Sequence, residues 1–288
     1  MDFALVVVIQ ILYAIASLAL ISVGLAIIFG MMGIINFAHG EFLMMGGYAF
    51  VLSVGAGVNF WIAMLVVAPV TVGVIGVIVE RLIIRHLYGR IIETVLATWG
   101  LSLFLIGLAS TVLGYHQKGV APPFGNVEIG GYREGGYTFF VIGITVVILA
   151  LVYAGLKYTR FGLIARGTMQ NANMASALGT GVNKIYAVTF GAGAALSGLA
   201  GAVLAPIAGV LPDIGATYVI KAFITVIGGG AVALSGTGAA SILFGTVSQA
   251  VTYLSRPVVG EVALLVVAII LLRLLPHGIT GRYFRKGL

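Results

Sequence analysis

The chain of 288 residues is 61% hydrophobic and only 8% charged, whereas a soluble domain usually carries about 25% charged residues. This composition excludes a water-facing globule of this length and predicts a protein whose solvent is the lipid bilayer. The net charge of +7 is assigned to basic cytoplasmic loops rather than to nucleic-acid binding. The absence of cysteine excludes disulfides, thiolate metal sites and a cysteine nucleophile.

Apolar runs divided by polar or glycine-rich breaks predict nine transmembrane helices. Only helices or closed barrels satisfy the backbone in lipid, and because these runs do not alternate, we expect an all-α polytopic membrane protein. The first run lacks a basic flank and is too long for a signal peptide, so a retained helix is expected. Eight or ten spans are alternatives, because the second, seventh and eighth runs are short and interrupted by glycine. The predicted spans are 4–29, 41–55, 60–80, 92–115, 137–156, 185–210, 218–234, 238–255 and 258–275.

Basic residues predict the orientation, because cytoplasmic loops are enriched in Lys and Arg. The breaks at 81–90, 157–184 and 273–286 hold eleven of these residues, and the opposite breaks hold four, namely Lys118, Arg133, Lys221 and Arg256. The N-terminus is therefore predicted to be outside, in the periplasm, and the C-terminus in the cytoplasm. Residues 116–136 become an external loop, and their glycines and prolines argue against one regular helix.

The stretch NFAHGE places three polar side chains, Asn36, His39 and Glu41, between two strongly apolar stretches. A charged side chain at mid-bilayer costs about 2.5–3.5 kcal/mol on insertion scales, so Glu41 needs an interface, a wet cavity or a partner. The neighbouring glycines permit a broken helix or re-entrant turn, which is tolerated at membrane depth where protein or water covers the freed backbone groups. Such breaks often line transport pathways. The alternative is an ordinary cytoplasmic turn in which Asn36 and Glu41 act as helix caps.

The longest predicted cytoplasmic loop is residues 157–184. Helical spacing predicts a short amphipathic helix over 168–178, ended by Gly179. Met169, Met174 and Leu178 give this helix an apolar face that is too small to cross a bilayer. From the residues alone, two interpretations stay open: the helix lies on the membrane surface, or it docks into a groove on a partner protein.

The run at 185–210 carries a face of small residues at every fourth position: Gly193, Ser197, Gly201 and Ala205. Small residues allow helix backbones to approach closely. The face therefore predicts tight helix packing, either inside the chain or at a subunit interface.

Motifs for chemistry are missing from the sequence. There is no G-x-x-x-x-G-K-[ST] motif, so the chain has no P-loop of its own, and neither H-E-x-x-H nor G-x-S-x-G is present. The four histidines have no metal-ligand spacing. We therefore predict no catalytic residues, no metal and no cofactor in this chain, and a protein that is not an enzyme.

Three stretches in order resemble one known family: GMMGIINFAHGEFLMMGGY, ETVLATWGLSLFL and TRFGLIARGTMQNANMASALGTGVNKIYAVTFGAGAALSGLAGAVLAPI. With the pattern of spans, they are similar to the integral permeases of branched-chain amino acid ABC importers, the LivH type. The resemblance covers nearly the whole chain, and the blocks are specific when found together. The ending RLLPHGI departs modestly from the family's usual Arg-Pro-x-Gly-Leu, because Arg273 and Pro276 are separated here.

The resemblance implies a multi-pass permease in the bacterial inner membrane, embedded in lipid and with no nucleic-acid partner. A periplasmic solute-binding protein captures the solute, and a second, homologous permease subunit completes the pathway as a heterodimer. Two cytoplasmic ATPase subunits bind ATP and Mg. Residues 1–288 form one permease domain, with 157–184 as its coupling segment.

The resemblance also implies roles for particular residues. Asn36, His39 and Glu41 are expected in the translocation pathway or its gate. Asp213 and Lys221, at the outer end, are expected to meet the binding protein, with loop solvation as the alternative. Docking on the ATPase is assigned to Arg166, Asn171, Met174, Ala175, Leu178 and Gly179.

The solute is expected to be a hydrophobic, branched-chain amino acid. Urea or short amides are an alternative, because the stretch TMQNANMA is reminiscent of permeases for such solutes, and small carboxylates or aromatic acids are another. A stand-alone channel or secondary transporter is the alternative from another class. It would need energy coupling of its own, such as proton movement through His39 and Glu41.

Overall fold

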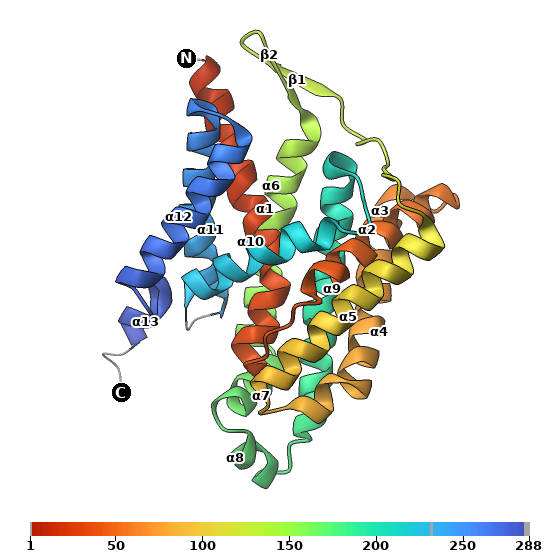
Figure 1. Ribbon diagram of the computed structural model, residues 1–288, viewed down its shortest axis with the longest axis vertical. Coiled ribbons are helices and arrows are strands. Elements are labelled where there is room, and N and C mark those ends of the chain that lie inside the picture. The colour runs from red at the N-terminus through yellow and green to blue at the C-terminus, as the bar shows by residue number, and fades with distance from the viewer. Residues whose placement is uncertain (1, 231–232, 285–288) are drawn as a thin grey trace. The chain divides into compact units, whose positions relative to one another are not determined.

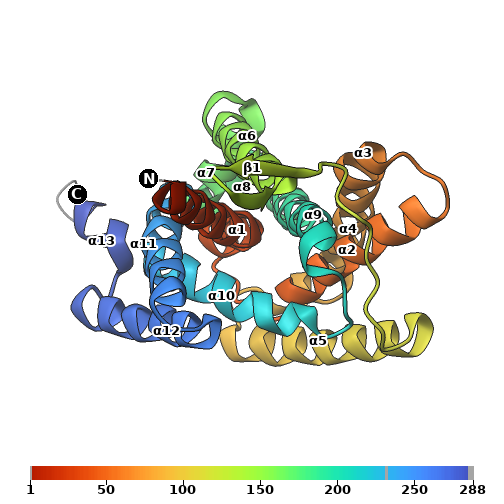
Figure 2. The same ribbon diagram turned by 90° about the horizontal axis from the view of Figure 1, so that it is seen from above.

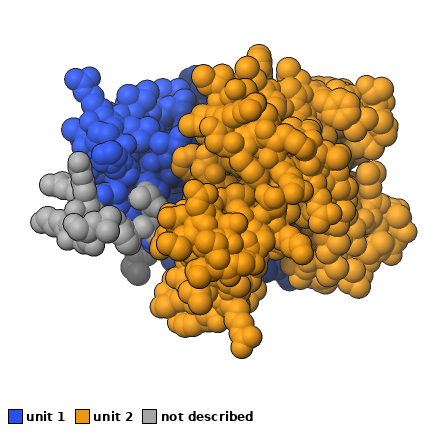
Figure 3. All heavy atoms as spheres, turned by 90° about the horizontal axis from the view of Figure 1, so that it is seen from below, with its two compact units in different colours: residues 1–22, 121–149, 221–288 blue, residues 23–120, 150–220 orange. Residues whose placement is uncertain are grey.

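The computed structural model describes residues 2–230 and 233–284, and these are almost entirely helical, as expected of an all-α polytopic membrane protein (Figure 1). The chain divides into two compact units, which Figure 3 distinguishes by colour. Unit 1 contains residues 1–22, 121–149 and 221–288, and unit 2 contains residues 23–120 and 150–220. Both units are discontinuous, so each draws on helices that lie far apart in the sequence.

Within the described residues, six helices are long and apolar enough to cross a membrane: Phe3–Met32, Phe60–Leu82, Ile91–Leu113, Gly136–Tyr158, Val182–Ala208 and Pro257–Gly281. A helix pair, Ile214–Gly229 and Leu234–Leu254, is bent by 115° at a short break and would make a seventh span. The predicted span 41–55 corresponds to α2 (His39–Gly55), which has only 17 residues. The predicted spans 218–234 and 238–255 fall on the bent pair. The count of nine is therefore not confirmed.

Some of the sequence predictions fall on residues that the structure does not describe. Residues 231–232, at the end of the predicted span 218–234, lie outside the described ranges, as do Arg285 and Lys286 among the eleven basic residues used for the orientation.

The core of unit 2 is built around α9 (Val182–Ala208), which packs against α4 (Ala68–Leu82) and α2. Figures 1 and 2 show α2 and α4 beside this helix. Small residues on α9 allow the close approach, because a Cβ atom on Gly201 would meet the Leu43 carbonyl oxygen of α2. Phe42 and Phe190 cross edge to face with ring centroids 6.0 Å apart. Around them lie Ile28, Ile34, Val72, Val79, Ile84 and Ala194.

The span that contains α4 is not a uniform helix. It begins with α3 (Phe60–Ile62), passes through a π-helical turn η1 (Ala63–Val67) and continues as α4. Pro69 lies at the start of α4, where it has no N–H to donate and its ring crowds the preceding turn. The π turn is the wider hydrogen-bonding register that accommodates this residue. A 3₁₀ turn η2 (Ile84–Leu87) and then α5 (Ile91–Leu113) follow.

Unit 1 contains the first part of α1 (Asp2–Met32), most of α6 (Gly136–Tyr158) and the last residues of α10 (Ile214–Gly229). Here α11 (Ala233–Leu254) packs against α12 (Pro257–Leu274) and α13 (Gly278–Phe284). The loop predicted to be external contains an antiparallel hairpin, β1 (Asn126–Ile129) with β2 (Tyr132–Gly135). The Gln10 amide of α1 donates to the Glu134 carboxylate at 2.6 Å. The prediction that residues 116–136 do not form one regular helix is therefore confirmed.

Candidate translocation site

The polar stretch at 36–41 follows an abrupt helix end. Gly33 has a φ of +64°, in the left-handed region that glycine adopts most readily. Its N–H closes the last turn of α1 by donating to the Phe29 carbonyl at 2.9 Å. This is the usual way in which a glycine stops an α-helix, and α2 starts only at His39.

Side chains satisfy the backbone groups that the break releases. The Asn36 Oδ1 atom accepts from the Ala38 N–H at 3.1 Å. The Thr98 hydroxyl oxygen of α5 accepts from the Phe37 N–H at 3.2 Å. An irregular backbone in a membrane needs such partners, because lipid offers none.

The break lies deep in the molecule, beside the middle of α9. The His39 Nδ1 atom is 3.1 Å from the Ser197 hydroxyl oxygen. Ser197 belongs to α9, which runs from Val182 to Ala208, so it lies about 22 Å from one helix end and about 16 Å from the other at 1.5 Å per residue. The break is therefore well away from both ends of α9, and its depth in the bilayer stays a prediction.

Two buried polar side chains beside the break are only partly satisfied. Asn36 is fully buried and Glu41 is 1% exposed. The Asn36 Nδ2 atom and the Glu41 Oε2 atom have no hydrogen-bond partner in the described part of the chain. An unpaired buried polar atom costs about 1–3 kcal/mol, and more if it is charged. Such groups in membrane proteins characteristically mark substrate or ion pathways. Glu41 lies in the first turn of α2, where the helix dipole favours a negative charge.

A polar stripe on α5, which was not predicted from the sequence, faces this break. Thr94, Thr98 and Ser102 recur every fourth residue and are buried, whereas Trp99 and Leu103 on the same helix are exposed. The Ser102 hydroxyl interacts with the Glu41 carboxylate, and Thr98 holds the Phe37 N–H. The spacing of these three hydroxyl residues was the available signal. The candidate site therefore combines α2, α5 and α9.

The segment predicted to be cytoplasmic, residues 157–184, differs from its prediction in the number of helices. One helix over 168–178 was expected, but the structure has two, α7 (Arg160–Gln170) and α8 (Ala172–Ala177). Asn171 separates them, because its backbone is extended and its Oδ1 atom accepts from the Met174 N–H at 2.9 Å. This is the geometry of an N-cap, which starts a new helix. Gly179 follows α8 with a φ of +82°, so the predicted end is in place.

The residues predicted for ATPase docking fall into two groups. Asn171, Met174, Ala175, Leu178 and Gly179 lie on or next to α8. Met174 is 59% exposed and Leu178 is 79% exposed, while Ala175 between them is buried. The sixth residue, Arg166, lies instead on α7, with its Nε donating to the Gly162 carbonyl at 3.3 Å. Exposed apolar side chains occur on both helices of the segment, with Leu163, Ile164 and Met169 on α7 and Met174 and Leu178 on or next to α8.

A family model described as branched-chain amino acid transport system / permease component matches residues 7–275. The chain belongs to this family. LivH from Escherichia coli strain K12, a high-affinity branched-chain amino acid transport system permease protein, is 29% identical over 287 residues, covering 93% of this chain and 92% of the relative. BraD from Pseudomonas aeruginosa, which has the same description, is 30% identical over 286 residues, with coverage of 93% and 92%.

A solved structure, PsaBC from Streptococcus pneumoniae in complex with Fab, contains a chain that aligns with 97% of the permease and 94% of its own length. The identity is 18% and the TM-score is 0.49. This likeness is too distant to support a statement about function.

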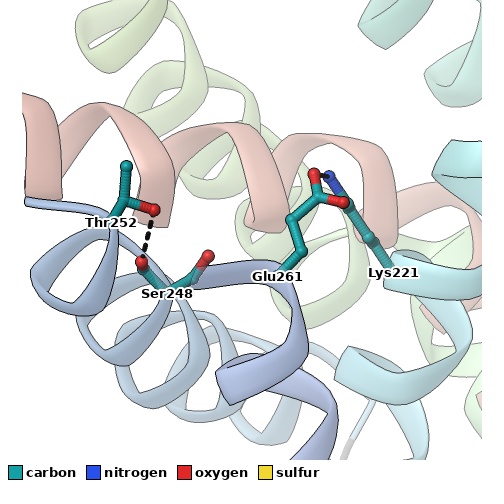
Figure 4. A network of polar contacts seen from close by, with 4 residues as sticks. All are labelled: Lys221, Ser248, Thr252 and Glu261. Atoms are coloured by element: carbon teal, nitrogen blue, oxygen red, sulfur yellow. Dashed lines mark hydrogen bonds and ion pairs between the residues drawn. The ribbon is translucent and has the colours of Figure 1, made fainter. Parts of the chain in front are cut away.

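Asp213 and Lys221, which were predicted to lie at the outer end, have separate partners within the chain. Asp213 accepts a hydrogen bond from the Tyr115 hydroxyl at 2.6 Å. This hydrogen bond raises the pKa of Tyr115 above its ordinary value, because the carboxylate favours the protonated phenol. Lys221 forms an ion pair with Glu261 of α12, with 2.6 Å between Nζ and Oε1 (Figure 4). Both predicted residues therefore form contacts within the chain, and Glu261 is a partner that the sequence analysis missed.

The ion pair between Lys221 and Glu261 predicts non-additive effects of substitution. Both residues lie on apolar helices, and their side chains are 27% and 57% exposed. The change Glu261→Gln leaves the Lys221 charge unpaired and is expected to lower Tm by about 2–4 °C, which corresponds to about 1 kcal/mol for a partly exposed pair. The double variant Lys221→Met/Glu261→Gln should recover most of this loss. A parental Tm for Glu261→Gln would show that the pair is energetically neutral.

The predicted small-residue face of α9 is buried against α1 and α2 within unit 2. A Cβ atom on Gly193 would lie 2.8 Å from the Gly24 carbonyl oxygen of α1. Ser197 donates to the Gly193 carbonyl at 2.9 Å and also lies against His39. Gly201 abuts Leu43, and Ala205 is 2% exposed. The face therefore serves packing inside the chain, and through Ser197 it also borders the polar break.

Proposed function

We propose that this permease is the transmembrane subunit of an ABC importer for branched-chain amino acids. The observation that carries the proposal is the match to the permease family over residues 7–275, together with relatives described as high-affinity branched-chain amino acid permeases. The buried polar break at Asn36, His39 and Glu41 supports a pathway or gate at that position. Substitutions at the break that leave the fold intact should therefore abolish or reduce solute transport.

The proposed topology has the N-terminus in the periplasm and the C-terminus in the cytoplasm of a bacterial inner membrane. Nine passes remain our proposal, in which α2, α10 and α11 each count as one pass. The direction in which successive spans cross the membrane supports counting α2 as a full pass. Both α1 and α4 would run inward, so the chain must return outward between them, and α2 is the helix that lies between them.

The permease is proposed to work with separate ATPase subunits, a second permease subunit and a periplasmic binding protein. The sequence supports this arrangement because it lacks a P-loop, so ATP and Mg would be bound elsewhere. The exposed Met174 and Leu178 side chains around α8 supply the apolar contact with the ATPase. Closure of the ATPase dimer on ATP would then shift the permease between its inward-open and outward-open states.

Uptake into proteoliposomes tests this function. The permease is reconstituted with its partner permease and ATPase subunits, and the binding protein is added outside. We expect saturable, ATP-dependent uptake of radiolabelled leucine, isoleucine or valine. ATP-dependent uptake of urea or acetamide without uptake of these amino acids would overturn the substrate assignment. Uptake driven by a proton gradient without ATP would overturn the importer assignment.

Coupling through α8 predicts that Met174→Asp will uncouple transport. Met174 is 59% exposed, so the carboxylate costs little in the isolated permease but must be desolvated in an apolar interface. We expect ATP-dependent uptake to fall at least about 10-fold and less ATPase to co-purify, while the level of permease in the membrane stays unchanged. Met174→Leu is the matched control and should retain uptake.

Gly179→Pro should have the same effect for a different reason. The φ of +82° at Gly179 is incompatible with proline, whose ring fixes φ near −65°, so the end of α8 is disturbed. If both Met174→Asp and Gly179→Pro transport at the parental rate, the assignment of coupling to α8 is wrong.

A further inference from the structure

The cytoplasmic side of unit 2 contains a cleft of about 720 Å³. One wall is the end of α4 with η2, which contributes Arg81 and Arg85, and the other is α8 with the first turn of α9, which contributes Lys184. These two walls are about 100 residues apart in the sequence, and the fold brings them together. Asn173 and Ser176 of α8 line the cleft, whereas Met174 and Leu178 of the same segment are exposed and are not among its lining residues.

The cleft is strongly basic. Arg81, Arg85 and Lys184 are all exposed. In the described part of the chain the ion pairs are Arg133 with Glu128 and Lys221 with Glu261, so none of the three cations of the cleft has a carboxylate partner there. The carboxylate that does line the cleft, Glu80, is fully buried and accepts a hydrogen bond from the Tyr88 hydroxyl.

A half-buried aromatic contact joins the two walls. The Tyr88 ring packs edge-on against Tyr186 of α9, with centroids 4.9 Å apart. Burial, and then the bond to Glu80, raises the pKa of Tyr88, so its hydroxyl remains a donor at neutral pH. Because Tyr88 contacts both Glu80 of α4 and Tyr186 of α9, the two elements that carry the cations are held together before any partner arrives. Such preorganisation lowers the entropic cost of binding.

The topology of a membrane protein explains part of this charge. Cytoplasmic loops are enriched in Lys and Arg, and a surplus of cations on this side is expected for that reason alone. It does not explain why cations from two distant segments converge on one cleft without carboxylate partners. An anionic group bound between the three exposed cations would relieve their mutual repulsion.

We propose that this cleft, lined by Arg81, Arg85 and Lys184, binds a carboxylate-bearing segment of the cytoplasmic ATPase. The inference rests on the proposed function and adds a second, electrostatic contact to the apolar one at α8. The ATPase would then hold α8 from two sides, with its apolar groove on Met174 and its acidic segment in the cleft. A pull on the ATPase would reach α4 and α9 together, and both pack against the helices of the polar break.

The lining favours a protein segment over an anionic lipid headgroup. A lipid site needs an apolar flank for acyl chains, but the apolar side chains in this cleft are limited to Ala172, Val182 and Ala187. The remaining surface is polar and includes Asn173, Ser176, Thr180 and Asn183. Such groups are suited to hydrogen bonds with carboxylates and peptide backbone.

Binding of purified ATPase subunits to the permease complex in nanodiscs tests the proposal. The variants are Arg85→Glu and Lys184→Glu, and the control is Arg90→Glu, which makes the same charge change at an exposed cytoplasmic residue outside the cleft. We expect the Kd to rise at least about 10-fold for each cleft variant and less than about twofold for the control. The dependence of Kd on NaCl should be shallower for the cleft variants, because one screened charge contact is lost.

The outcomes separate this proposal from the proposed function. If Met174→Asp weakens ATPase binding and the cleft variants do not, coupling through α8 stands and the acidic contact is refuted. If none of these variants weakens binding, both assignments fall. The alternative of a lipid site is tested by comparing nanodiscs of phosphatidylglycerol, an anionic lipid, with nanodiscs of phosphatidylcholine. A cleft variant that loses bound phosphatidylglycerol but keeps its affinity for the ATPase would overturn the proposal in favour of a lipid site.

Discussion

Replacing Gly201 with alanine is expected to lower the Tm of the purified permease by about 5–10 °C and to reduce its level in the membrane. A Cβ atom at this position would overlap the Leu43 carbonyl oxygen of α2. The Cβ atom is bonded directly to the α9 backbone and the carbonyl belongs to the α2 backbone, so neither can rotate away as a flexible side chain would. Overpacking of this kind costs about 1–3 kcal/mol or more, and for a chain of this size each kcal/mol shifts Tm by about 2–4 °C. Thermal unfolding followed by fluorescence in nanodiscs measures the change.

Gly143→Ala on α6 provides a matched control, because a Cβ atom there has no neighbour within 4 Å. The same methyl group should leave Tm unchanged or raise it slightly, since alanine has the higher helix propensity. If Gly201→Ala and Gly143→Ala have the same Tm, the contact between α2 and α9 is looser than described. The packing of α2 against α9 in unit 2 would then need an explanation other than small residues at the contact.

The face on α9 shows how far small-residue spacing can be interpreted. The spacing from Gly193 to Ala205 predicted close packing, and these residues are buried. The spacing did not identify the helix that packs against this face, because an internal contact and a subunit contact require the same small residues. Only the fold brings Gly201 to Leu43 and Gly193 to Gly24. Composition and hydropathy therefore predicted the class of fold, while the partners of each helix depended on long-range packing.

The prediction of a single helix across Asn171 was wrong for a local reason. Helical periodicity continues across this residue, so one helix was predicted over 168–178. Asn171 instead caps α8 with its own side chain, and asparagine is among the best N-cap residues. Periodicity and capping chemistry compete here, and the cap prevailed. Gly179 was predicted correctly because glycine at a helix end is a stronger local signal than periodicity.

The candidate site was predicted in part. Asn36, His39 and Glu41 were found because strongly polar side chains are costly in an apolar context. Thr98 and Ser102 were missed, because Ser and Thr are common in membrane helices, where their hydroxyls can satisfy the helix's own carbonyls. Thr98 does so with the Thr94 carbonyl at 2.9 Å, yet it also holds the break. A hydroxyl residue with two such roles cannot be recognised from its residue type.

The strongest test of the site is Glu41→Gln, which is expected to reduce ATP-dependent uptake at least about 10-fold, a loss of about 1.4 kcal/mol. Glutamine keeps the size and shape of the side chain but cannot carry a negative charge. Glu41 is 1% exposed, and its Oε2 atom has no hydrogen-bond partner among the described residues. Burying an unpaired charge disfavours folding, so the amide should fold as well as the parent or better. We therefore expect Tm to stay within about 2 °C of the parental value or to rise.

This combination distinguishes a pathway residue from a packing residue. A residue that only packs would lose stability and transport together, whereas a pathway residue loses transport while the fold is kept. Glu93→Gln is the matched control, because Glu93 also lies in the first turn of a helix but is exposed. It should retain both Tm and uptake. If Glu41→Gln transports at the parental rate, the carboxylate has no part in the pathway, and the polar break is only the place where α1 ends and α2 begins.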